Sequence, residues 1–192
     1  MEVITMEKKS NFTTYKVVFI GMMAAVVCVV TFFRFPFLGS KVHFGNSMCL
    51  LSGLMFGPLG GGLAAGFGSA IYDIFFGGYG IVESLITFVS KFLMAFICAL
   101  IAGSYKTDKD SKARVIAGSI IGALSYVCLY MLKTFIYQRF VYGFPADAVL
   151  VTMGSKLPAS LINALFAMIA APLLYAAIKP ILSRTGSLDK IR

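Results

Sequence analysis

Charged side chains are scarce in this sequence of 192 residues: 13% are Asp, Glu, Lys or Arg, whereas 59% are hydrophobic. A soluble domain of this length has too much surface relative to its volume to bury so many apolar side chains. A bilayer removes the conflict, since helices of about 20 mostly apolar residues satisfy their own backbone hydrogen bonds within it. The alternation typical of membrane β-strands is also lacking. We therefore expect an all-α integral membrane protein with a single domain.

Motifs for catalysis and cofactor binding are missing as well. The sequence contains no GxxxxGK[ST] loop for nucleotide phosphates and no GxSxG nucleophile elbow, and a single histidine cannot form HExxH. The four cysteines lie in apolar stretches without the CxxC spacing of a metal or redox site, which favours buried hydrophobic roles. We expect no catalytic residue, metal or cofactor, and a protein that binds or transports a solute instead of an enzyme.

The net charge of +9 could indicate a nucleic-acid partner, but the positions of the cations argue against one. Lysine and arginine gather at the N-terminus, in the polar loop 105–114 and at the C-terminus. Such clusters mark cytoplasmic segments under the positive-inside rule. We expect a multi-pass protein of a bacterial-type plasma membrane, with cytoplasmic tails at 1–14 and 179–192 around a bundle at about 15–178.

Apolar runs predict six membrane spans, at about 15–33, 44–57, 60–76, 81–103, 115–137 and from near Pro158 to 178. The second and third spans are short, and the pair Gly57-Pro58 breaks the chain between them. Pro36 and Gly39 interrupt any helix that would follow the first span. An even number of spans places both termini on one side, in agreement with the distribution of charge.

One stripe of the third span combines small residues with an acid, at Gly62, Gly66, Ser69 and Asp73. Their spacing of i, i+4, i+7 and i+11 places them on one helix face. The glycines are most simply packing residues that allow another helix to approach closely. A carboxylate within a membrane helix costs about 2.5–3.5 kcal/mol, so Asp73 needs a partner or a wet cavity.

Polar residues recur at helical spacing in later spans: Glu83, Thr87 and Lys91; Tyr126, Tyr130 and Lys133; Lys156, Ser160 and Asn163; with His43 and Asn46 at the mouth of the second span. Solvated helix ends would also explain Asp73 and Glu83, and a loop position would explain His43. Lys133 could snorkel to the membrane surface, and Tyr126 could be a packing residue. Lys91 in mid-span and the amide of Asn163 are harder to explain without polar partners. Most of these groups fall in the outer half of the bundle, which predicts an outward-facing polar cavity.

The run KVHFGNSMCLLSGLMFGPLGGGLAAGFGSAIYDIFFGGY (41–79), followed by TFVSKFLMAFI (87–97), resembles the S components of energy-coupling factor (ECF) transporters, in particular the riboflavin-transporter-like group. The resemblance extends over essentially the whole chain. It implies a six-helix subunit that binds one micronutrient and delivers it inward. The implied partners are a transmembrane coupling subunit and two cytoplasmic ATPase subunits, which agrees with the missing phosphate loop.

The resemblance also implies a ligand site near the outer face. Carried onto this sequence, it comprises Lys41, His43, Asn46, Asp73, Glu83, Thr87, Lys91, Tyr126, Tyr130, Ser160 and Asn163. S components often use an AxxxA pattern on the first span to contact the coupling subunit. Here two small-xxx-small pairs take its place, and we assign partner docking to Gly21, Ala24, Ala25 and Cys28.

The predicted site mixes cations, acids, an amide and tyrosines, and the chain contains no tryptophan. This mixture suits a neutral, ring-shaped vitamin: pyridoxine-like, hydroxymethylpyrimidine-like or riboflavin, with the two smaller rings favoured. The alternative is a stand-alone channel or facilitator, which would need a continuous polar path, whereas the inner halves of the spans look dry. A purely structural subunit would not need Lys91 and Asn163 within the membrane.

Overall fold

Helices form most of the described chain, and five of them are long and apolar enough to cross a bilayer. The structure is a computed structural model that describes residues 13–37, 40–105 and 111–187. Its elements are α1 (Thr14–Phe32), β1 (Arg34–Phe37), β2 (Ser40–His43), α2 (Gly45–Tyr72), the π-helical turn η1 (Asp73–Gly77), α3 (Ile81–Ala102), α4 (Lys112–Ile136), the π-helical turn η2 (Tyr137–Val141) and α5 (Ala146–Arg184). The expectation of a mostly helical membrane protein is confirmed.

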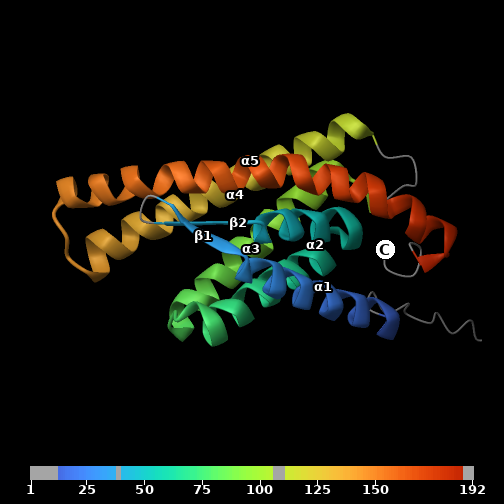
Figure 1. Cartoon of the computed structure of the whole chain (residues 1–192), viewed down its shortest axis with the longest axis horizontal. Coiled ribbons are helices and arrows are strands. Elements are labelled where there is room, and N and C mark those ends of the chain that lie inside the picture. Colours follow the sequence, from blue (N-terminus) through green and yellow to red (C-terminus); the bar gives the residue numbers. More distant parts are fainter. Residues whose placement is uncertain (1–12, 38–39, 106–110, 188–192) are drawn as a thin grey trace, which may run out of the picture.

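The helices form a bundle with distinct ends. α4 and α5 run side by side along one side, α1 lies on the opposite side, and α2 and α3 lie between them (Figure 1). α1 and α4 begin and α5 ends at the same end of the bundle, while the α2–α3 connection and the α4–α5 connection lie toward the other. Parts of both predicted tails, of the predicted polar loop and of the break after the first span lie outside the described residues.

The segment after α1 forms a small antiparallel hairpin, where the sequence predicted only an interruption. Thr13 caps α1 by accepting a hydrogen bond from the Lys16 N–H (3.3 Å), and the helix ends at Phe32. β1 then pairs with β2 so that Arg34 lies opposite His43. Four-residue strands carry too little alternation to be recognised in a sequence, and proline is tolerated in such an edge strand.

α2 contains both short predicted spans and a sharp break between them. At Gly57 the backbone adopts φ 76° and ψ −173°, a conformation that favours glycine, and Pro58 follows. The two halves then fold back on each other: a Cβ atom on Gly61 would lie 2.4 Å from the Cα atom of Gly53. In a straight helix, residues eight positions apart are about 12 Å apart. The Ser52 hydroxyl bridges the halves by donating to the Gly61 carbonyl oxygen (2.8 Å).

α2 is the centre of the bundle, where it packs against α1, α3 and α5. In its most apolar window 78% of residues are buried, against 22% to 39% for the other four candidate spans, so those present far more of their surface to lipid. The glycines of the predicted stripe are packing residues, as expected: Gly62 meets the Phe92 ring and Gly66 meets Phe88, both on α3. Gly68 lies against the backbone carbonyl of Ala24 on α1.

α5 differs from its prediction at both ends. It begins at Ala146, after the N-cap Pro145, and Pro158 lies inside the helix instead of in its first turn. The sequence interpretation used a rule for helix starts, whereas membrane helices also tolerate interior proline because neighbouring groups satisfy the freed backbone. α5 continues to Arg184, so the first part of the predicted tail from 179 is helical.

Candidate functional site

A cavity of about 590 Å³ lies between the hairpin, the α2–α3 connection and the facing parts of α3, α4 and α5. Its size is within the range of small-molecule sites. All of the predicted binding residues except Asn46 line it: Lys41, His43, Asp73, Glu83, Thr87, Lys91, Tyr126, Tyr130, Ser160 and Asn163. The structure therefore brings the predicted polar stripes together, while their role in binding stays a prediction.

Lys91 of α3 forms the most deeply buried charged group of the site. Its side chain is 3% exposed, and its Nζ donates a hydrogen bond to Oδ1 of Asn46, which is 1% exposed and lies behind the lining. Nζ also lies 3.5 Å from the centre of the Tyr126 ring, a cation–π contact. Within the described chain no carboxylate lies within 4.0 Å of Nζ. An amide and an aromatic face therefore hold this cation, in place of an ion pair with Asp73 or Glu83.

Tyrosines form one wall of the cavity. The rings of Tyr126 and Tyr130 are nearly parallel, with an interplanar angle of 23° and centroids 6.2 Å apart. The Tyr130 hydroxyl lies 3.5 Å from the Ser40 hydroxyl, which connects α4 to the hairpin. Parallel aromatic faces of this kind suit a flat ring that can stack on them.

The two acids of the cavity lie where α2 ends and α3 begins. Asp73 is the first residue of η1 and Glu83 lies in the first turn of α3. The Asp73 carboxylate lies beside Thr87 and within electrostatic reach of Lys91 and Lys133. The last part of the glycine stripe thus reaches the cavity, whereas its first part packs against α3. π-helical turns such as η1 often occur at functional sites.

Asn163 lines the cavity and also makes two hydrogen bonds that its sequence position did not suggest. Its Oδ1 accepts a hydrogen bond from the His43 N–H (2.8 Å), and its Nδ2 donates to the Lys41 carbonyl oxygen (2.8 Å). Both ends of the amide are thus engaged with the backbone of β2. Asn163 therefore fixes the hairpin against α5 beside the cavity, and it acts as a positioning residue.

His43 is neutral and serves as a hydrogen-bond acceptor. Burial, together with the nearby cations Lys91, Arg34 and Lys41, lowers its pKa from 6.5 to about 3. Its Nδ1 accepts a hydrogen bond from the Gly45 N–H at the start of α2 (3.2 Å). The imidazole thus joins the hairpin to α2 and adds no charge to the cavity near neutral pH.

Several lining residues were not among the predicted binding residues. They include Arg34, Tyr72, Tyr79, Lys133, Tyr137, Gln138, Tyr142 and Lys156. Tyr137 extends the α4 stripe by one turn from Lys133, so helical spacing could have found it. Gln138 is the next residue of the π-helical turn η2. Its Oε1 is buried without a hydrogen-bond partner in the described chain, and such an acceptor needs a donor from water or a ligand.

A second, apolar groove of about 410 Å³ lies on α1 and α2, and it contains all four predicted docking residues. Gly21 and Ala25 are exposed, whereas Ala24 and Cys28 are buried. Ala24 lies against Gly68 of α2. The first small-xxx-small pair is therefore open to a partner, while the second is largely used for packing within the bundle.

Comparisons with known proteins agree with this geometry. The family described as the S component of ECF-type riboflavin transporters matches residues 11–180. A protein of Pyrococcus woesei, described as an uncharacterized protein in a gap 3′ region, is 31% identical over 127 residues, which are 65% of this chain and 78% of that protein. A solved structure of the S component of a bacterial ECF transporter has a TM-score of 0.62 at 22% identity, and the match covers 87% of this chain and 96% of that one. At this identity the structural likeness shows the fold.

Proposed function

Because the chain belongs to the family of S components of ECF-type riboflavin transporters, we propose that it captures a water-soluble heteroaromatic vitamin outside the cell and delivers it inward. The candidate substrates are pyridoxine-like compounds, hydroxymethylpyrimidine-like compounds and riboflavin itself. The observation that carries the proposal is the tyrosine-walled polar cavity at one end of an otherwise apolar bundle. A channel would need a polar path through the whole bundle, whereas this cavity occupies only one part of the bundle.

The proposed topology has six crossings of a bacterial-type plasma membrane and cytoplasmic termini. The break at Gly57 and the contact between Gly53 and Gly61 support two crossings within α2. Lys112, Arg114 and the last turn of α5 with Arg184 lie at the end of the bundle remote from the cavity. A cytoplasmic position for that end follows the positive-inside rule and turns the cavity outward.

The ligand that copurifies with the protein tests the proposal. We expect the chain, purified in detergent from its host cells, to release a ring-shaped vitamin on denaturation, identified by mass spectrometry. The same vitamin, added back at 1,000 times its Kd, should stabilise the protein by about 4 kcal/mol. A visible flavin spectrum would identify riboflavin. Release of no small molecule, together with no thermal shift across a panel of vitamins, would contradict the proposal.

The open part of the α1 groove is the proposed docking site for the transmembrane coupling subunit, which acts with two ATPase subunits. Ala25→Leu should prevent close approach of a partner helix, because Ala25 is exposed and a larger side chain would fill the groove. We expect ligand binding to persist and copurification with the coupling subunit to fall about tenfold or more, measured by quantitative immunoblot. The matched control is Val26→Leu, at an exposed neighbouring position outside the groove. Equal copurification of the two variants would disprove this docking site.

A further inference from the structure

The cavity contains more cations than carboxylates. Its lining includes five cations and two acids: Arg34, Lys41, Lys91, Lys133 and Lys156, against Asp73 and Glu83. The excess is three positive charges, since His43 is neutral. Such an excess within a partly enclosed space attracts anions more strongly than the same charges would on an open surface.

Apart from Lys91, which lies in the middle of α3, these cations lie toward the end of the bundle where the positive-inside rule predicts few of them. Pairing with acids does not explain their presence, because in the described ranges no carboxylate lies within 4.0 Å of any of the five. A set of lysines and an arginine kept on the outer side, without ion pairs, indicates a role in binding.

Tyrosine rings contact four of these five cations, Arg34, Lys41, Lys91 and Lys133, but a ring does not neutralise their charge. The guanidinium of Arg34 lies 5.4 Å from the centre of the Tyr72 ring, and Lys133 Nζ lies 5.7 Å from the centre of the Tyr137 ring. A cation–π contact stabilises a cation without using its N–H groups as hydrogen-bond donors to a lone pair. The donors of these side chains thus stay available for an acceptor that enters the cavity.

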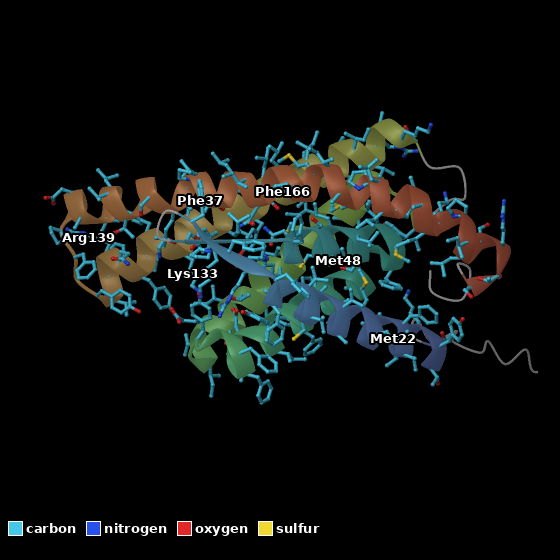
Figure 2. The ribbon with its side chains drawn as sticks, in the orientation of Figure 1. Met22, Phe37, Met48, Lys133, Arg139 and Phe166 are labelled. Atoms are coloured by element: carbon cyan, nitrogen blue, oxygen red, sulfur yellow. The ribbon has the colours of Figure 1, made fainter. Side chains whose placement is uncertain are left out.

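Two of the cations converge on one ring. Nζ of Lys41, from β2, lies 5.6 Å from the centre of the Tyr79 ring, and Nζ of Lys133, from α4, lies 5.9 Å from the same centre. In Figure 2, Lys133 lies beside the hairpin, whereas Arg139 lies farther out along the α4–α5 pair. An anion that contacts both ammonium groups would be attracted by each of them. Asp73 and Glu83 are within electrostatic reach of Lys133 but form no ion pair with it.

We propose that the substrate carries an anionic group, a carboxylate or a phosphate, which binds between Lys41 and Lys133 beside Tyr79. Its ring then extends toward Tyr126 and Tyr130. The inference rests on the proposed transport function. It changes the expected charge of the substrate, since the composition of the site alone suggested a neutral ring. The buried acceptor Oε1 of Gln138 is suited to a hydroxyl or N–H donor on the same substrate.

Matched neutral and anionic probes test this proposal with the full-length chain in detergent. The pairs are pyridoxine and pyridoxine 5′-phosphate, riboflavin and riboflavin 5′-phosphate, and nicotinamide and nicotinate, measured by titration calorimetry. In each pair that binds, we expect the anionic member to bind about ten- to a hundredfold more tightly. The two pairs with a 5′-phosphate and the nicotinamide–nicotinate pair show whether the site prefers a phosphate or a carboxylate. The preference should weaken as salt concentration rises.

Two variants assign the preference to the proposed residues. Lys133→Gln and Lys41→Gln, the second at an exposed side chain, should each reduce the preference about tenfold, mainly by weakening the binding of the anionic member. Arg139→Gln removes the same charge outside the cavity lining and should retain the preference. A neutral member that binds as tightly as its anionic partner, or a preference unchanged in both lysine variants, would overturn the anion proposal and leave the transport function standing. If no probe binds and no molecule copurifies, both proposals fail.

Discussion

Replacing Gly61 by leucine is expected to prevent the protein from folding. A Cβ atom at this position would lie 2.4 Å from the Cα atom of Gly53 and 2.5 Å from the Ser52 carbonyl oxygen. Both neighbours are backbone atoms, which cannot turn aside as a flexible side chain could. Overpacking a core typically costs about 1–3 kcal/mol, and here it would also separate the two halves of the most buried helix. Ser52, whose hydroxyl bonds the Gly61 carbonyl, would lose that partner as well.

The measurement is size-exclusion chromatography with thermal unfolding in detergent. We expect no monodisperse peak for Gly61→Leu and a lowered melting temperature for Gly61→Ala. Gly154→Ala is the matched control, because a Cβ atom there meets nothing within 4 Å and alanine is the better helix former by about 1 kcal/mol. A Gly61→Leu protein that melts like the wild type would show that the two halves of α2 do not pack as described.

The Asn163→Leu variant is expected to release the hairpin from α5 while leaving the bundle folded. The substitution removes the partners of the His43 N–H and the Lys41 carbonyl oxygen. Each backbone group left unsatisfied in a buried place costs about 1–3 kcal/mol. Since Lys41 and His43 line the cavity, a loosened hairpin should lower ligand affinity about tenfold or more.

Hydrogen exchange at the His43 amide reports this effect directly. We expect that amide to exchange markedly faster in Asn163→Leu than in the wild type. Asn163→Asp keeps an acceptor for the His43 N–H but loses the donor to Lys41, so an intermediate rate is expected. Unchanged protection of the His43 amide in Asn163→Leu would show that Asn163 does not fix the hairpin, whatever happens to ligand affinity.

The sequence predicted best the helices whose apolar runs end at a charged residue or at glycine. The first span was expected at 15–33 and α1 is Thr14–Phe32; the fourth was expected at 81–103 and α3 is Ile81–Ala102. Gly80 and Gly103 flank α3, and Gly103 adopts a left-handed cap conformation with φ 60°. The predicted start of α5 was wrong because a proline such as Pro158 can lie either in the first turn of a helix or inside a membrane helix. A local sequence pattern does not distinguish these two cases.

Helical spacing also found much of the candidate site. It placed Glu83, Thr87 and Lys91 on one face of α3, and the structure has all three in the cavity lining. It did not reveal that Asn163 bonds the backbone of the hairpin, because that contact joins segments about 120 positions apart. Tyr79 lies in a connection, where no periodicity exists to place its ring near two cations.

The position of Lys91 has a consequence for biosynthesis. A lysine at the centre of a helix opposes insertion into the bilayer by about 2.5–3.5 kcal/mol, and α3 contains the most hydrophobic window of the five candidate spans, which offsets this cost. Asn46, which accepts the hydrogen bond from Lys91, belongs to α2 and is synthesised earlier, whereas the Tyr126 ring belongs to α4 and is synthesised later. As the chain emerges from the ribosome, Lys91 can therefore find its amide partner before its aromatic one. The pairing of α2 with α3 is thus the assembly step that first shields this cation from lipid.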